Sequence, residues 1–132
     1  MMKIYQGVDL VQISKFREIF IKNKGLVSDI FTEQETRYCT SKKDPYIHFA
    51  GRFAAKEAGL KALGIGLSGT GIDNTLREIE VVNAPSGKPE LVFHGWAGKI
   101  STKRNISQAT VSISHSGNYA VATVILTANY TV

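Results

Sequence analysis

The chain of 132 residues contains one cysteine, Cys39, and therefore cannot form an internal disulfide bond. A lone cysteine also lacks the spacing of a metal-binding motif, and we interpret Cys39 as a packing residue. Long apolar runs are absent too, because the longest one, residues 119–126, is far too short to cross a bilayer. The N-terminus reaches Asp9 before an apolar run of signal-peptide length develops. These absences favour a cytoplasmic protein with no membrane association.

Signatures of several function classes are missing as well. The formal net charge is +5, yet the chain has no Lys/Arg-rich block, no aromatic interleaving for base stacking and no RNA-recognition signature. It has neither a Walker A sequence nor a G-x-S-x-G elbow. Gly64, Gly66 and Gly69 satisfy G-x-G-x-x-G, but they follow a predicted helix instead of a strand, which excludes a Rossmann loop. Residues 64–71 are either a loop that permits close approach of a nucleotide or a helix stop and linker.

The composition is that of one globular domain. The hydrophobic fraction is 43% and the charged fraction 20%, as in ordinary folded proteins. A chain of this length buries roughly two thirds of its unfolded surface. We therefore predict a single domain over residues 1–132, and the positive charge indicates an acidic or phosphorylated partner.

Strands and helices alternate along the chain without repeats. We predict an α+β fold in which a largely antiparallel sheet packs against a long central helix. The predicted strands cover residues 3–12, 76–83, 90–93, 109–115 and 119–126. The predicted helices cover residues 14–23, 32–41, 45–64 and 95–104. Gly25 is expected to end the first helix, and Thr32 with Glu35 forms a capping box for the second.

The most informative segment is F-A-A-K-E-A-G-L-K, at residues 53–61. Glu57 and Lys61 are four residues apart and share a face of the predicted helix. A carboxylate flanked by two ammonium groups suits a metal-bound phosphate. The alternative is a surface ion pair worth about 0.3–0.5 kcal/mol. Lys56 is either a second phosphate contact or an exposed neighbour.

Asp9 is the second chemical feature. It lies in an otherwise apolar strand, where an unpaired carboxylate is costly. A structural ion pair with Arg52 or Lys61 would neutralise it. Alternatively, Asp9 and Glu57 form a pair of oxygen ligands, which favours Mg²⁺ over zinc, with waters and substrate phosphates completing the shell.

Three separated segments carry a resemblance to a known family. They read G-V-D-L-V at 7–11, G-R-F-A-A-K-E-A-G-L-K at 51–61 and V-S-I-S-H-S-G-N-Y-A-V-A at 111–122. In order and spacing the chain resembles the holo-acyl-carrier-protein synthases, the short class of phosphopantetheinyl transferases. The resemblance implies Mg²⁺-dependent transfer of 4'-phosphopantetheine from coenzyme A to a serine of apo acyl carrier protein. Adenosine 3',5'-bisphosphate would leave, and the reaction would support fatty acid biosynthesis.

The resemblance also implies roles for individual residues. Asp9 and Glu57 would be the metal ligands, and Glu57 and Lys61 would be catalytic. Lys61 would also bind coenzyme A, together with Arg52 and His115. Whether Glu57 or a metal-bound water accepts the serine proton is not decided by the sequence.

The family provides a partner for the basic first helix. Its Lys15, Lys22 and Lys24 would dock the acidic carrier protein, although a merely solvated helix face is the alternative. The resemblance also implies that a chain of this length forms a homotrimer with active sites at subunit interfaces. Two other function classes remain: a basic nucleic-acid-binding module and a noncatalytic relative that binds carrier protein without Mg²⁺.

Overall fold

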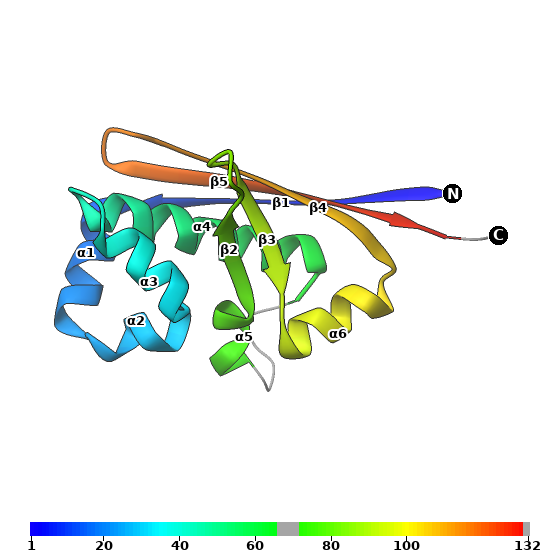
Figure 1. The fold of residues 1–132 in the computed structure, drawn as a ribbon, viewed down its shortest axis with the longest axis horizontal. Coiled ribbons are helices and arrows are strands. Elements are labelled where there is room, and N and C mark those ends of the chain that lie inside the picture. Colours follow the sequence, from blue (N-terminus) through cyan, green and yellow to red (C-terminus); the bar gives the residue numbers. More distant parts are fainter. Residues whose placement is uncertain (66–71, 131–132) are drawn as a thin grey trace.

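The computed structural model describes residues 1–65 and 72–130, and this part of the chain contains two antiparallel sheets (Figure 1). The larger sheet has the strand order β1-β5-β4, formed by Met2–Gln12, Tyr119–Asn129 and Ile106–Ser116. The smaller sheet pairs β2 (Ile79–Asn83) with β3 (Pro89–Phe93). The predicted antiparallel α+β architecture is confirmed.

The helices all lie on one side of the larger sheet (Figure 1). Their bounds are α1 (Ile13–Lys22), α2 (Gly25–Ile30), α3 (Glu33–Thr40), α4 (Pro45–Leu63), α5 (Ile72–Glu78) and α6 (Gly95–Lys103). The long helix α4 runs along the sheet, while α1, α2 and α3 gather at one end of the molecule. None of the described helices is long and apolar enough to cross a membrane.

Small residues allow α4 to pack closely on the sheet. The helix begins at Pro45 and ends at Gly64, whose φ of 73° is left-handed, as the sequence predicted. Where α4 crosses β1, a Cβ on Gly7 would lie 2.0 Å from the backbone oxygen of Ala58. Only glycine permits this approach. The crossing brings the residues that follow Gly7 against the second half of α4.

Aromatic side chains fill a second core, between α1 and the first half of α4. The rings of Phe16 and Phe20 stack with centroids 4.0 Å apart, and those of Phe31 and Phe49 lie 4.9 Å apart. Cys39 is fully buried in this core, in agreement with a packing role. The aromatic core therefore fixes α1 relative to α4.

Two segments differ from the sequence prediction. Gly25 begins helix α2 instead of ending the first helix, and residues 76–78 are the end of α5 instead of the start of a strand. The guanidinium of Arg77 explains both, because it donates hydrogen bonds to the backbone oxygens of Ser28 and Phe31. A contact between residues so far apart leaves no local pattern, and α2 has no side-chain cap that would mark its start.

A fully buried ion pair ties α4 to the elements around it. Lys56 Nζ donates to Glu35 Oε1 at 2.6 Å and to the backbone oxygens of Leu76 and Ile79 at 3.0 and 2.7 Å. Glu35 also accepts a hydrogen bond from the backbone nitrogen of Val81. All three ammonium protons of Lys56 are used, so this pair joins α3, α4, α5 and β2.

Removal of the buried cation gives a stability prediction. Lys56→Met should lower the free energy of unfolding by about 3–5 kcal/mol, because Glu35 remains buried without a counter-charge. Adding Glu35→Leu should recover part of that loss. The measurement is urea unfolding followed by circular dichroism.

The control for this experiment is Lys22→Met. The Lys22 and Glu18 side chains of that pair are 70% and 66% exposed, so we expect a change below about 1 kcal/mol. If the Lys56→Met single variant and the double variant unfold at the same urea concentration, the buried pair does not act as described.

Candidate active site

The Asp9 side chain lies on the face of β1 that packs against α4. Lys61 Nζ donates to Asp9 Oδ1 at 3.1 Å and to the backbone oxygen of Val8 at 3.0 Å. The side chain of Asp9 is 19% exposed and that of Lys61 54% exposed. Lys61 is thus the cation that neutralises Asp9 in the structure, and the alternative partner, Arg52, lies elsewhere.

Glu57 is one helical turn before Lys61 on α4. Burial raises the pKa of the Glu57 carboxyl, and the negative charge of Asp9 raises it further, while Lys61 opposes both effects. Asp9 and Glu57 therefore interact as two like charges in a partly buried site. Such a pair of carboxylates favours binding of a cation between them.

A cavity of about 470 Å³ opens onto this pair. Asp9 and Glu57 line it together with Lys15 of α1 and with apolar side chains of α1, α2 and α4, among them Ile19, Leu26 and Phe53. We call it the active-site cavity. The apolar residues of α2 were missed by the sequence analysis, because α2 itself had not been predicted. Their position beside the carboxylates shows that the cavity combines a charged end with an apolar wall.

The donor set in this cavity fits magnesium. The described residues contain no cluster of three or more His, Cys, Asp or Glu side chains that could hold a metal. Two carboxylates alone do not make a zinc site, which requires at least three protein ligands. Mg²⁺ instead often takes one or two carboxylates and completes its shell with water and phosphate oxygens. Asp9 and Glu57 provide that number and kind of ligand.

Lys56 does not belong to the active-site cavity. The sequence analysis left it as a phosphate contact or an exposed neighbour, and both interpretations are wrong, because its side chain is 0% exposed and bonded to Glu35. A helix turns by 100° per residue, so adjacent residues cannot share a face. Of the two lysines in the motif, only Lys61 faces the carboxylates.

Arg52 and His115 lie apart from the active-site cavity, in a second basic cluster. The Arg52 guanidinium is 3.8 Å from the ring centroid of Tyr38, and Lys42 Nζ is 4.6 Å from the same centroid. His48 is also near, and its pKa is lowered by burial and by the positive charges of Lys42, Arg52 and His115. We call these five residues the Tyr38 cluster. Within one protomer, the structure does not bring Arg52 and His115 to the carboxylates.

Arg52 has an unused donor. Its side chain is 5% exposed and its terminal nitrogen donates to Asn83 Oδ1 at a long 3.4 Å. Its Nε is the buried side-chain atom for which the described residues provide no hydrogen-bond partner. This donor is therefore not satisfied by the part of the chain that the structure describes.

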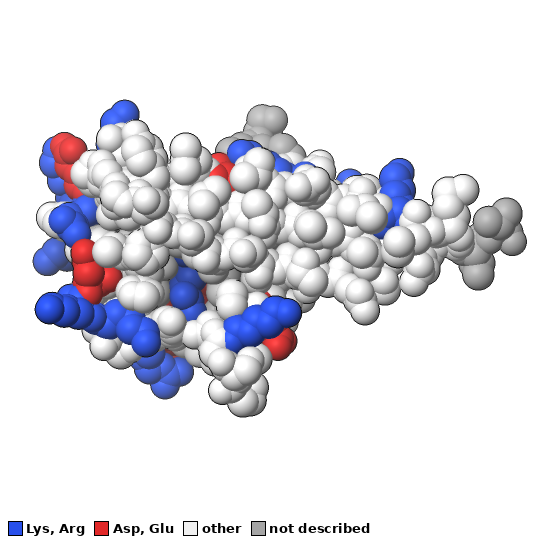
Figure 2. Space-filling view, turned by 90° about the horizontal axis from the view of Figure 1, so that it is seen from above, with Lys and Arg blue, Asp and Glu red and all other residues white. Residues whose placement is uncertain are grey.

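The three lysines of the predicted docking helix lie in different surroundings. Lys15 lines the active-site cavity, whereas Lys22 pairs with Glu18 at 3.2 Å on the surface and Lys24 lines a different cavity. Figure 2 shows Lys and Arg side chains gathered at the end of the molecule that carries α1, α2 and α3. The basic end and the carboxylate pair therefore adjoin, with Lys15 between them.

Comparison with known proteins gives concordant matches. A family model described as the 4'-phosphopantetheinyl transferase superfamily matches residues 6–124. The holo-[acyl-carrier-protein] synthase of Syntrophotalea carbinolica is 46% identical over 124 residues, which is 93% of this chain and 94% of that protein. Fatty acid synthase subunit alpha of Schizosaccharomyces pombe is 40% identical over 119 residues, or 90% of this chain and 6% of that protein.

A solved structure has the same fold. It is an ACPS–CoA complex from Chronobacterium ammoniagenes, with a TM-score of 0.85 and 30% identity, and the match covers 97% of this chain and 99% of that one. The matches cover nearly the full chain and therefore include both motifs that contribute to the cavity, residues 7–11 and 51–61.

The interaction between the two carboxylates predicts how stability depends on pH and Mg²⁺. Because the folded state raises the pKa of Glu57, this group contributes stability below its unfolded pKa and loses it as the pH rises through the folded value. In metal-free buffer at pH 7, Glu57→Gln should therefore melt at a higher temperature than the wild type. Below about pH 4, where the Glu57 carboxyl is protonated and neutral like the amide of the Glu57→Gln variant, the difference should vanish. Thermal unfolding in EDTA at several pH values measures this.

The same variant tests the metal site. Mg²⁺ should raise the melting temperature of the wild type and of the surface control Glu90→Gln, but not of Glu57→Gln. An equal response to Mg²⁺ in all three proteins would contradict a site at Glu57.

Proposed function

The chain belongs to the 4'-phosphopantetheinyl transferase superfamily, and on this basis we propose that Asp9, Glu57 and Lys61 form its catalytic centre. The enzyme is of the holo-[acyl-carrier-protein] synthase type, which transfers 4'-phosphopantetheine from coenzyme A to a serine of apo acyl carrier protein. The observation that carries the assignment is the meeting of a strand carboxylate and a helix carboxylate in one cavity, with Lys61 bonded to the strand carboxylate. Neither the nucleic-acid-binding nor the noncatalytic alternative explains this arrangement.

Asp9 and Glu57 would hold Mg²⁺ through their carboxylate oxygens. When bound, Mg²⁺ screens the charge of the coenzyme A pyrophosphate and makes its β-phosphorus a better electrophile. The raised pKa of Glu57 supports the proposal, because a cation between the two carboxylates would remove their repulsion.

Lys61 would neutralise phosphate charge during the transfer. In the structure it holds Asp9, but more than half of its side chain is exposed. Once a metal ion satisfies Asp9, the ammonium group is free to turn to a phosphate oxygen. A positioned cation stabilises the negative charge that develops on the leaving adenosine 3',5'-bisphosphate.

Arg52 and His115 would bind coenzyme A that is held by a neighbouring subunit. The orphan Nε of Arg52 and the group of positive charges in the Tyr38 cluster suit a phosphate. Because the cluster is separate from the active-site cavity of its own protomer, the two half-sites meet only if subunits associate. The coenzyme would then lie across the interface.

The outer face of the larger sheet supports assembly into a homotrimer. The residues of β1, β5 and β4 that face away from α4 include no charged side chain. Exposed apolar residues lie along β1 on this face: Ile4, Val8 and Leu10 are 59%, 53% and 63% exposed. Figure 2 looks onto this face and shows a largely uncharged strip. An uncharged face of this kind is typical of a surface that another copy covers.

The acidic carrier protein would dock on the basic end of the molecule. Of the three docking lysines, Lys15 is the nearest to the chemistry, since it lines the active-site cavity with Glu57. Lys22 and Lys24 extend the positive surface beyond it. The match to a fatty acid synthase subunit supports a role in fatty acid biosynthesis.

The transfer can be tested by intact mass spectrometry. Apo acyl carrier protein incubated with the enzyme, coenzyme A and Mg²⁺ should gain one phosphopantetheine group, and EDTA should abolish the gain. Asp9→Ala and Glu57→Ala should lower the rate by at least about 100-fold, because each removes a metal ligand. No gain with several carrier proteins, although a reference enzyme modifies them, would refute the activity.

Mixing of two variants tests the shared site in the same assay. Lys61→Ala and Arg52→Ala should each be nearly inactive. After dissociation and reassembly of an equal mixture, about one quarter of the interfaces in a cyclic trimer combine two intact half-sites. We therefore expect activity to return to about one quarter of the wild-type value. If the mixture stays inactive, Arg52 and Lys61 do not act across an interface.

A further inference from the structure

A second cavity, of about 560 Å³, lies between α2, α3 and α5. Lys24, Arg37 and Arg77 form its polar side, and Val27 and Phe31 contribute apolar surface. We call it the α2–α3 cavity. The α2–α3 cavity shares no residue with the active-site cavity or with the Tyr38 cluster. The role proposed so far for Lys24 does not explain why Lys24 lines a cavity together with two arginines.

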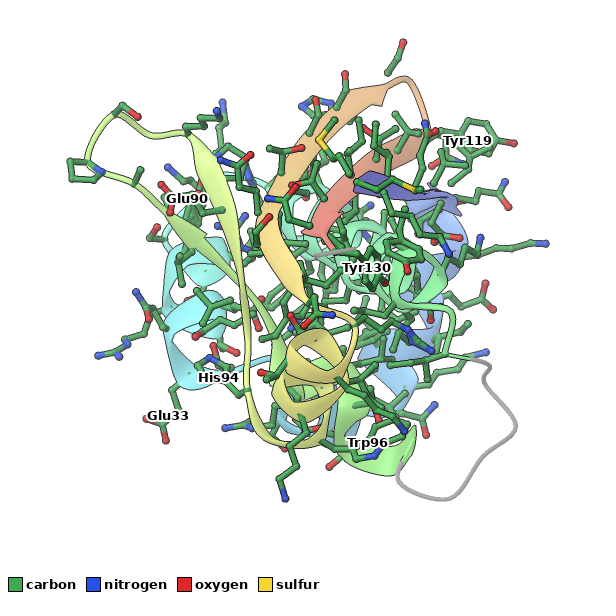
Figure 3. All side chains as sticks on the ribbon, turned by 90° about the vertical axis from the view of Figure 1, so that its right-hand side faces the viewer. Glu33, Glu90, His94, Trp96, Tyr119 and Tyr130 are labelled. Atoms are coloured by element: carbon green, nitrogen blue, oxygen red, sulfur yellow. The ribbon has the colours of Figure 1, made fainter. Side chains whose placement is uncertain are left out.

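The charges of this cavity are unbalanced. Three cations line it, and Glu33 is the acidic residue among its lining side chains. Glu33 is exposed and points outward from α3 (Figure 3). Arg77 is fixed by its hydrogen bonds to the backbone of Ser28 and Phe31. Within the described part of the chain, no hydrogen bond or ion pair engages the side chain of Lys24 or of Arg37, so both side chains are available to an anion.

Helix α2 separates the two cavities. Leu26 and Ile30 on one of its faces line the active-site cavity, while Val27 and Ser28 on another line the α2–α3 cavity. A helix with its side chains is about 10–12 Å across, whereas a small domain is about 30 Å in diameter. A carrier protein that places its serine at Glu57 therefore extends over α2.

We propose that the α2–α3 cavity is a second contact site for the acyl carrier protein and takes an acidic side chain of it against Lys24 and Arg37. The proposal rests on the docking proposed above and extends it to the far side of α2. A specific interface covers about 800 Å² on each partner, which is more than one cavity provides. Charge complementarity selects the occupant, since the carrier is the acidic partner of this enzyme and the free cations lie beside its docking helix.

The test compares charge reversals of exposed residues. Arg37→Glu and Lys24→Glu should each raise the KM for apo acyl carrier protein by about five- to tenfold and flatten its dependence on salt, while the KM for coenzyme A stays constant. Lys88→Glu and Lys99→Glu make the same change of charge on the β2–β3 turn and on α6. These controls should change the KM for the carrier less than twofold, because a change in net charge alone has only a small effect on binding.

A spin label locates the carrier directly and does not depend on kinetics. Cys39 is fully buried and burial raises the pKa of its thiol to about 12, so a label attaches only to an introduced cysteine. A label on Arg37→Cys should broaden NMR signals of residues beside acidic side chains of the carrier. A label on Lys99→Cys should leave those signals sharp.

The outcomes separate this proposal from the proposed function. If Lys15→Glu weakens carrier binding but Arg37→Glu behaves like the Lys88→Glu control, the docking stands and the second contact is refuted. If the wild type transfers no phosphopantetheine, the proposed function itself fails. A selective effect at Arg37 and Lys24, with broadening from the Arg37 label, establishes the second contact.

Discussion

The close crossing of α4 over β1 is the contact on which the rest of the site depends. Gly7 lies against the Ala58 backbone with no room for a side chain. Because Asp9 is two residues further along β1, it projects from the same face of the strand toward α4. Glu57 and Lys61 flank Ala58 on the helix. The absence of a side chain at Gly7 thus allows Asp9 and Glu57, which are 48 positions apart in the sequence, to lie close together.

The opposite side of α4 is held by a different kind of interaction. Lys56 is bonded to Glu35 and to two backbone oxygens, and these contacts fix the rotation of the helix about its axis. The rotation matters because it decides which residues face β1. Adjacent residues in the same motif therefore have separate tasks: Lys56 orients the helix, and Glu57 uses that orientation to approach Asp9.

Much of the fold was predictable from local patterns. Pro45 and Gly64 marked both ends of α4, and the capping box at Thr32 marked the start of α3. The apolar run at 3–12 and the turn residues at 116–118 identified the long strands. The errors came from long-range contacts. Arg77 of α5 donates hydrogen bonds to the backbone oxygens of Ser28 and Phe31 at α2, and this long-range contact has no local signal. The loop expected at 66–71 lies outside the described residues.

The site was predictable in part for the same reason. Asp9, Glu57 and Lys61 stood out because charged residues in apolar surroundings need partners, and the structure brings those three together. Helical spacing alone could not tell that Lys56 points into the core, since that depends on which neighbours surround α4. The separation of Arg52 from the carboxylates is likewise a tertiary fact, and in the proposed assembly a subunit interface would bring the two together.

The most direct test of the account is a crystal structure of this protein with coenzyme A and Mg²⁺. We expect a metal ion within about 2.1 Å of an oxygen of Asp9 and of Glu57, with pyrophosphate oxygens completing the shell and Lys61 turned from Asp9 to a phosphate. Bound coenzyme A with the Lys61–Asp9 pair intact and no metal between the carboxylates would contradict the central claim that α4 and β1 together build a magnesium site.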